Sequence, residues 1–299
     1  MTVTPAEQFA DDNGWRRRSV RTNGVSLHCV EAGDPASQRI VLLLHGFPEF
    51  WYAWRRLLGP LGAAGLRAIA PDLRGYNLSG KPPRVMDYAM AELVADVVGI
   101  VREANVPRVT LVGHDWGGII AWQVAMRHPE LLDRLVILNA PHPAAFDREL
   151  RRSTTQWLRS TYVLAFQLPW LPEAILRAND WHLLRRMMRH DPVVPGAFSR
   201  LDIDRYAAAL ARPRALASAL NYYRALSRVP AALADVRRID TPTLVFWGDH
   251  DKYLVGSLAE GLETWVPSVR VERLPDASHW LHHERPTEVL AKMVDFING

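Results

Sequence analysis

The sequence has one cysteine and no long apolar run, and each lack excludes a class of protein. With Cys29 alone among 299 residues, no disulfide can form within the chain, which favours a reduced, cytoplasmic environment. No segment approaches the roughly 18 uncharged apolar residues of a membrane-spanning helix. The first residues, MTVTPAEQFADDNGW, lack the apolar region of a signal peptide. We therefore expect a globular cytoplasmic protein with no membrane association.

Concentrated positive charge is also lacking. The formal net charge is +4, and the basic residues, nearly all arginine, are scattered among 32 acidic residues. Nucleic-acid binding proteins carry clustered basic residues instead, so no nucleic-acid partner is expected. The sequence leaves open whether the chain is a monomer or a homodimer.

Short apolar runs alternate with helical patterns in the first half of the chain, as in repeated β-α-β units around a parallel sheet. Two strands are expected within 18–30, joined at Asn23-Gly24. The other strands are expected at 40–46, 66–71, 108–114, 133–140, 241–248 and 269–276, and the clearest helices at 88–104, 118–127 and 286–297. The alternation stops between 141 and 229, where leucine, alanine, arginine and aromatic residues follow a helical spacing. We expect a core of 1–140 and 230–299, interrupted by a helical cap at 141–229.

Reactive residues follow four of the expected strands. They are found in HGFP (45–48), at Asp115 within LVGHDWGG, in WGDHD (247–251) and in SHW (278–280). The carboxyl ends of parallel strands meet at one edge of a sheet, where such proteins place their chemistry. LVGHDWGG has the outline of the Gly-x-Ser-x-Gly turn that holds a hydrolase nucleophile, with aspartate in place of serine.

An aspartate at this position indicates attack on a saturated carbon. A serine would form an ether there, which an enzyme of this kind cannot hydrolyse, whereas a carboxylate forms an ester that water cleaves at its carbonyl. A carboxylate is also ionised at neutral pH and needs no base to activate it. A histidine is then available for the water of the second step. The usual structural role of such an aspartate, to cap the following helix, is the alternative for Asp115.

The chain resembles the bacterial soluble epoxide hydrolases of the α/β-hydrolase fold. The resemblance spans nearly the whole sequence and rests on HGFPEFWYAWR, PDLRGYNLSGKP, GHDWGG, NAPHP, WGDHD and ASHW, in this order. It implies a mostly parallel central sheet flanked by helices, with the cap inserted after the sixth strand. The implied reaction converts an apolar epoxide and water to a vicinal diol without a cofactor, in a detoxification role.

The resemblance also assigns roles to residues of the proposed site. Asp115 is the nucleophile, His279 the general base and Asp251 the acid that orients it, with Asp249 as competitor for that last role. The backbone N–H groups of Phe47 and Trp116 form the oxyanion hole, and a cis bond precedes Pro48.

Two tyrosines of the cap are expected to donate hydrogen bonds to the epoxide oxygen. The alkoxide of an opening epoxide is a poor leaving group, and neutral phenols suit it as donors. Tyr162 in STYVLAFQLPW and Tyr223 in NYYRAL match the family's cap tyrosines, with Tyr222 as alternative to Tyr223. We expect an apolar substrate pocket that includes four further aromatic residues: Phe47, Trp116, Phe166 and Trp280.

Three other interpretations compete with this one. A haloalkane or haloacetate dehalogenase uses the same aspartate nucleophile, but its sequence typically has asparagine in place of Phe47 or arginine in place of Trp116. A non-catalytic, ligand-binding member of the fold is the second. A metal site at His282-His283 is the third; we expect no metal, because adjacent helical residues diverge and no third ligand has a suitable spacing.

Overall fold

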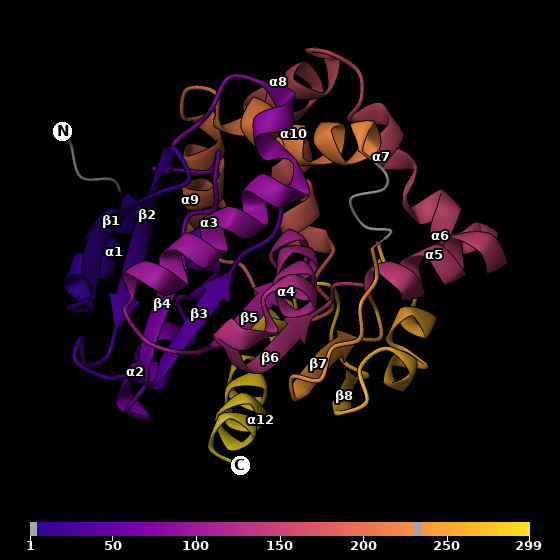
Figure 1. Cartoon of the computed structure of the whole chain (residues 1–299). Helices are drawn as coiled ribbons and strands as arrows, with labels where there is room; N and C mark the ends of the chain where they lie inside the picture. Colours follow the sequence, from indigo (N-terminus) through magenta and orange to yellow (C-terminus); the bar gives the residue numbers. More distant parts are fainter. Residues whose placement is uncertain (1–4, 230–234) are drawn as a thin grey trace.

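The computed structural model describes residues 5–229 and 235–299, and its centre is a single eight-stranded sheet (Figure 1). The strand order is β1-β2-β4-β3-β5-β6-β7-β8. β2 pairs antiparallel with β1 and β4, and all other neighbours are parallel. The expectation of a mostly parallel sheet is confirmed. The strands are β1 (Arg16–Thr22), β2 (Val25–Ala32), β3 (Ile40–Leu44), β4 (Arg67–Pro71), β5 (Val109–His114), β6 (Leu132–Leu138), β7 (Thr243–Gly248) and β8 (Val269–Leu274).

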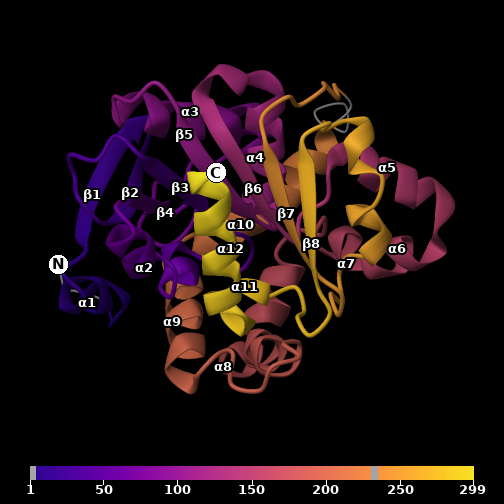
Figure 2. The same cartoon turned by 90° about the horizontal axis from the view of Figure 1, so that it is seen from below.

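Helices cover both faces of the sheet, which explains why β3 is apolar along its whole length and why every residue of β3 and β5 is buried. α3 and α4 pack together against one face, and α2 and α12 against the other (Figures 1 and 2). The helices of this core are α1 (Pro5–Asp12), α2 (Leu58–Ala63), α3 (Met90–Glu103), α4 (Trp116–Arg127), α11 (Leu281–Glu284) and α12 (Pro286–Asn298). Short 3-10 turns complete it: η1 (Trp51–Trp54), η2 (Val85–Tyr88), η3 (Pro129–Leu131), η5 (Gly256–Ala259) and η6 (Leu262–Thr264).

Among the described residues, six α-helices follow one another between β6 and β7, and α8, α9 and α10 lie above the sheet in Figure 1. They are α5 (Pro143–Arg152), α6 (Thr154–Arg159), α7 (Thr161–Ala165), α8 (Leu171–His190), α9 (Arg200–Ala211) and α10 (Ala215–Arg228). We call them the cap. The cap boundaries of 141–229 proposed from the sequence stay a prediction, and residues 230–234, the start of the second core segment, lie outside the described part of the chain. No helix of the described residues has the length and apolar character needed to cross a membrane.

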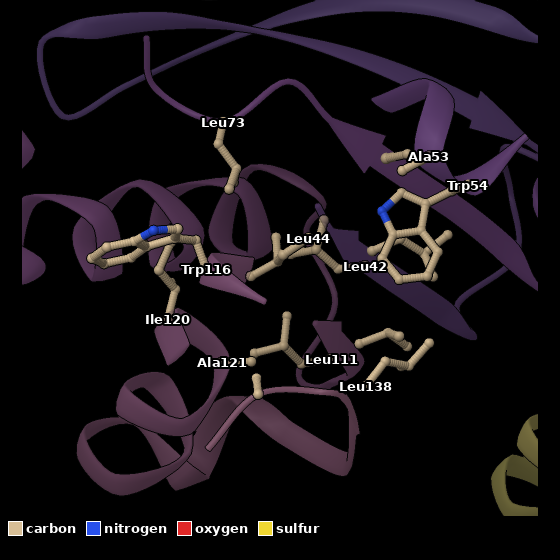
Figure 3. Close-up of a cluster of buried hydrophobic side chains, with 14 of the residues drawn as sticks. Leu42, Leu44, Ala53, Trp54, Leu73, Leu111, Trp116, Ile120, Ala121 and Leu138 are labelled. Atoms are coloured by element: carbon tan, nitrogen blue, oxygen red, sulfur yellow. The ribbon is translucent and has the colours of Figure 1, made fainter. Parts of the chain in front are cut away.

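The core continues from the sheet into both helical layers. Trp116, Ile120 and Ala121 of α4 lie on one side of Leu44, and Trp54 of η1 lies on the other (Figure 3). All five side chains are at most 3% exposed. The strand and the two layers therefore form one continuous packed core, which fixes where β3 ends relative to the start of α4.

Close packing of the backbone at this point requires glycine at position 117. A Cβ added there would lie 2.1 Å from the carbonyl oxygen of Leu44, which belongs to the backbone of β3 and cannot move aside. Gly59 of α2 differs, because a Cβ there would meet only Trp15, at an ordinary 3.5 Å.

We expect Gly117→Ala to lower the free energy of unfolding by about 1–3 kcal/mol, the usual cost of overpacking a core. Gly59→Ala should leave it unchanged or raise it slightly, because alanine favours a helix more than glycine does. Urea unfolding followed by circular dichroism measures both. Equal stability of the two variants would contradict the close approach of β3 and α4.

Candidate active site

The nucleophile predicted from the sequence lies in the sharp turn between β5 and α4. Asp115 has φ 50° and ψ −119°, and its side chain makes no capping hydrogen bond to α4, so the structure does not support the helix-cap alternative. The side chain of Asp115 instead packs against the loop after β3. A Cβ on Gly46 would lie 2.4 Å from that of Asp115, so only glycine permits this approach.

Two groups face the carboxylate of Asp115 from different strand ends. The backbone N–H of Phe47 donates a hydrogen bond to Oδ1 at 2.8 Å. His279 Nε2 lies 3.7 Å from Oδ2, too far for a hydrogen bond. The Phe47–Pro48 peptide bond is cis, as the resemblance implied. One carboxylate oxygen is therefore held by an amide, and the other faces the imidazole across a short gap.

The acid beside His279 is Asp251, which follows β7. Its Oδ2 lies 2.7 Å from Nδ1 of His279 and also accepts a hydrogen bond from the side-chain amide of Asn139 at 2.5 Å. The competitor Asp249 forms an ion pair with Arg273 instead. Asn139 was not singled out from the sequence, although it opens the NAPHP block directly after β6. Its own Oδ1 accepts from the backbone N–H of Gly248, so Asn139 ties the ends of β6 and β7 together around Asp251.

Burial and electrostatic attraction have opposite effects on the pKa values of His279 and Asp251. Burial alone would lower the pKa of His279, but the charge and hydrogen bond of Asp251, with a smaller contribution from Asp115, raise it to about 9. Burial would raise the pKa of Asp251, and His279 and Asn139 together hold it below its usual range. At neutral pH His279 is therefore an imidazolium between two carboxylates.

The two cap tyrosines face this site from α7 and α10. The rings of Tyr162 and Tyr223 lie 5.9 Å apart, and both residues line the same cavity as Asp115. Burial, reinforced by the negative charge of Asp115, raises the pKa of each hydroxyl, so both phenols are neutral donors at any physiological pH. Tyr222 points elsewhere: its hydroxyl donates to the carbonyl oxygen of Arg74 at 2.7 Å. The geometry therefore favours Tyr223 over Tyr222 as the second donor.

The cavity, of about 490 Å³, lies between the core and the cap. Phe47, Phe166 and Trp280 line it, as expected from the sequence, together with apolar residues of α8 and α9 such as Leu184, Met187 and Leu210. Trp116 is not among the lining residues. Its buried ring packs edge-on against those of Tyr222 and Tyr223, at centroid distances of 5.4 and 5.0 Å, and its place in the substrate pocket stays a prediction.

The reasoning from sequence against a metal at His282-His283 is wrong on both of its points. The two rings lie 4.1 Å apart, and Glu49 supplies a third group, with potential ligand atoms of all three residues within 4.8 Å of one another. Glu49 comes from the loop after β3, so no local spacing could reveal it.

The contacts among Glu49, His282 and His283 nevertheless include hydrogen bonds that occupy the potential ligand atoms of Glu49 and His283. The guanidinium of Arg55 can only donate, and it lies 3.1 Å from Nδ1 of His283, so this ring nitrogen is the acceptor. The ring proton of His283 is therefore on Nε2, which donates a hydrogen bond to Glu49 at 2.7 Å.

Glu49 also connects to the backbone of His279 through His114. Nδ1 of His114 lies 2.8 Å from Glu49, and Nε2 lies 2.9 Å from the carbonyl oxygen of His279. Burial would raise the pKa of Glu49, but His282 and His114 hold it well below its usual range. His114 therefore connects the buried carboxylate of Glu49 to the backbone of His279.

Comparison with known proteins agrees with this geometry. A family model described as "alpha/beta hydrolase fold" matches residues 39–286. The chain is 39% identical to the AB hydrolase superfamily protein YfhM of Bacillus subtilis, over 96% of this chain and 99% of that protein. It is 37% identical to epoxide hydrolase 3 of Xenopus tropicalis, over 93% of this chain and 76% of that protein. The crystal structure of a mutant epoxide hydrolase from Bacillus megaterium superimposes with a TM-score of 0.85 at 31% identity, covering 94% of this chain and all of the other.

The chain belongs to the α/β-hydrolase family. Within that family its sequence and its fold group it with the epoxide hydrolases, as the resemblance predicted. The expected fold class, including the mostly parallel sheet flanked by helices, is that of the family.

The pair of Asp251 and His279 generates a prediction about titration. In the wild-type protein we expect the pKa of His279 to be about 9. In Asp251→Asn no carboxylate faces Nδ1 of His279, so nothing at that atom offsets the effect of burial. The pKa of His279 should therefore fall toward or below the ordinary histidine range. A histidine-selective ¹⁵N NMR titration measures this. Asp249→Asn is the matched control and should leave the titration unchanged; the opposite ranking of the two variants would assign the acid to Asp249.

Proposed function

We propose that the chain is an epoxide hydrolase that forms an alkyl ester on Asp115 and releases a vicinal diol. The observation that carries the proposal is the pair of phenols, Tyr162 and Tyr223, that share an apolar cavity with an aspartate nucleophile. Neutral phenols donate to a developing alkoxide, the leaving group of an epoxide. The names of the relatives support the same substrate class.

In the first step Oδ2 of Asp115 attacks a carbon of the epoxide. A bond forms between that carbon and Oδ2, and the bond between the carbon and the epoxide oxygen breaks. The oxygen, which leaves with the electron pair, takes a proton from one of the two phenols, Tyr162 or Tyr223. The protonated His279 then returns a proton to the resulting phenolate, which leaves the imidazole neutral for the second step. Oδ1 stays on the N–H of Phe47 throughout, so it becomes the carbonyl oxygen of the ester.

In the second step His279 removes a proton from water. The free enzyme holds His279 protonated, in part through the charge of Asp115. Esterification removes that charge, which lowers the pKa of the imidazole and favours its basic form. The resulting hydroxide adds to the ester carbonyl, and the N–H groups of Phe47 and Trp116 stabilise the oxyanion on Oδ1. Collapse breaks the bond between Oδ2 and the carboxyl carbon, and Oδ2 takes a proton from His279 and leaves as one oxygen of the diol. The carboxyl group of Asp115 now carries the oxygen of water, and its proton returns to His279, which restores the free enzyme.

Isotope labelling tests the ester. A single turnover in H₂¹⁸O should place the label on Asp115 and not in the first diol released, as mass spectrometry of the Asp115 peptide and of the product would show. His279→Gln should accumulate the ester, because ring opening does not need the base. Label in the first diol would mean that water attacks the epoxide directly.

The tyrosines are tested by stopped-flow measurement of ring opening. Each of Tyr162→Phe and Tyr223→Phe removes one hydrogen bond to developing charge, worth about 1.5–3 kcal/mol, which corresponds to a loss of roughly 10- to 100-fold in the rate. The double variant should lose more than either single one. Tyr222→Phe is the control, since its hydroxyl bonds the backbone of Arg74, and it should change stability without slowing ring opening specifically.

The substrate class is tested with a panel of aryl and alkyl epoxides beside chloroalkanes and haloacetates. Diol formation with no halide release is expected. Halide release without turnover of any epoxide would instead assign the aspartate chemistry to a dehalogenase.

A further inference from the structure

The loop that carries Asp251 is bound to the cap from two directions. The loop spans 251–255, directly after β7. Within it, the backbone N–H groups of Tyr253 and Leu254 donate to Oδ1 of Asp251 at 2.7 and 3.0 Å. The second carboxylate oxygen bonds His279 and Asn139. The direction of the carboxylate thus depends on the path of the loop backbone.

Helix α6 of the cap holds both ends of this loop. Arg159 donates from one guanidinium nitrogen to the carbonyl oxygens of Asp251 and Leu254, at 2.7 and 2.8 Å. Gln156 donates to the carbonyl oxygen of Tyr253 and accepts from the N–H of Val255, both at 3.0 Å. Four hydrogen bonds from two cap side chains therefore satisfy the loop backbone.

These two side chains are unlike the rest of α6. Gln156 is its buried residue, at 0% exposure, whereas the neighbouring Trp157 and Leu158 are exposed to solvent. The helix is therefore attached to the core by directional polar bonds and not by its apolar side chains. Polar bonds of this kind specify the position and orientation of the loop, which apolar packing would leave adjustable.

The end of α8 makes a second attachment. Asp191 accepts hydrogen bonds from the hydroxyl of Tyr253 and from Nζ of Lys252, the latter at 2.9 Å. The ring of Tyr253 in turn lies edge-on to that of His279, at a centroid distance of 5.2 Å. The loop is thus enclosed between α6, α8 and the general base.

We propose that Arg159 and Gln156 are positioning residues for the general base, acting through the loop of Asp251. The cap, which supplies the phenols for ring opening, then also sets the geometry of ester hydrolysis. This inference rests on the proposed roles of Asp251 and His279. A general base must lie within hydrogen-bond reach of its water, and a misplacement of about 1 Å can lower a rate by about 100-fold.

The rates of the two half-reactions, measured separately, distinguish positioning of the general base from a general structural role of Arg159 and Gln156. Ring opening uses Asp115 and the phenols and does not need the base, whereas ester hydrolysis needs His279 held by Asp251. We expect Arg159→Met to slow ester hydrolysis by about tenfold or more, with ring opening within about twofold of wild type. The ester should therefore accumulate in the steady state. Gln156→Met, a substitution of similar size, should act in the same direction, and Arg159→Lys should restore part of the rate.

The rate constants of ring opening and of ester hydrolysis are measured in rapid-quench single turnovers with an aryl epoxide. Mass spectrometry of the intact protein detects the ester at each time point. Arg152→Met is the matched control, because Arg152 is exposed and makes no hydrogen bond or ion pair with the described residues; both steps should keep their rates. A variant that merely lost stability would have fewer active molecules but an unchanged ratio of the two rate constants. An unchanged ratio in both Arg159→Met and Gln156→Met would overturn the inference. Absence of the ester in the wild-type protein would instead overturn the proposed function.

Discussion

The arrangement of the site depends on the close approach of the end of β3 to the turn between β5 and α4. Neither Gly46 nor Gly117 can carry a Cβ, since one would meet the side chain of Asp115 and the other the carbonyl of Leu44. Asp115 is held at φ 50° in this contact, with its carboxylate on the N–H of Phe47. Packing of two backbones against each other therefore orients the carboxylate before any substrate binds, which is the preorganisation that electrostatic catalysis requires.

The buried carboxylates near this contact are paired with histidines. His279 lies between Asp251 and Asp115, and its raised pKa reflects the pull of both carboxylates against burial. On the other side of the sheet end, Glu49 is matched by His114 and His283. Buried carboxylates without such partners would cost several kcal/mol each. His279 thus holds the pKa of Asp251 below its usual range, and His282 and His114 do the same for Glu49, so that both buried carboxylates stay ionised.

The cap contributes to the site in two distinct ways. Its aromatic and aliphatic side chains close the cavity over Asp115, and Tyr162 and Tyr223 place two neutral donors there. Its polar side chains on α6 and α8 bond the backbone around Asp251. Cap and core therefore share the candidate site: Asp115, the proposed nucleophile, belongs to the core, whereas the loop of Asp251 is bonded by side chains of the cap.

The sequence by itself determined the order of strands and helices and the positions of Asp115, Asp251 and His279 at strand ends. These properties are local, because apolar periodicity and turn residues are written into neighbouring positions. Only the tertiary structure decided that the ring of Trp116 packs against Tyr222 and Tyr223, that Tyr223 rather than Tyr222 lines the cavity, and that Glu49 bonds His283. It also revealed the bonds from Gln156 and Arg159 to the loop of Asp251. The direction of a side chain, and its contact with a residue far away in the sequence, follow from how helices pack on the sheet, which no local spacing encodes.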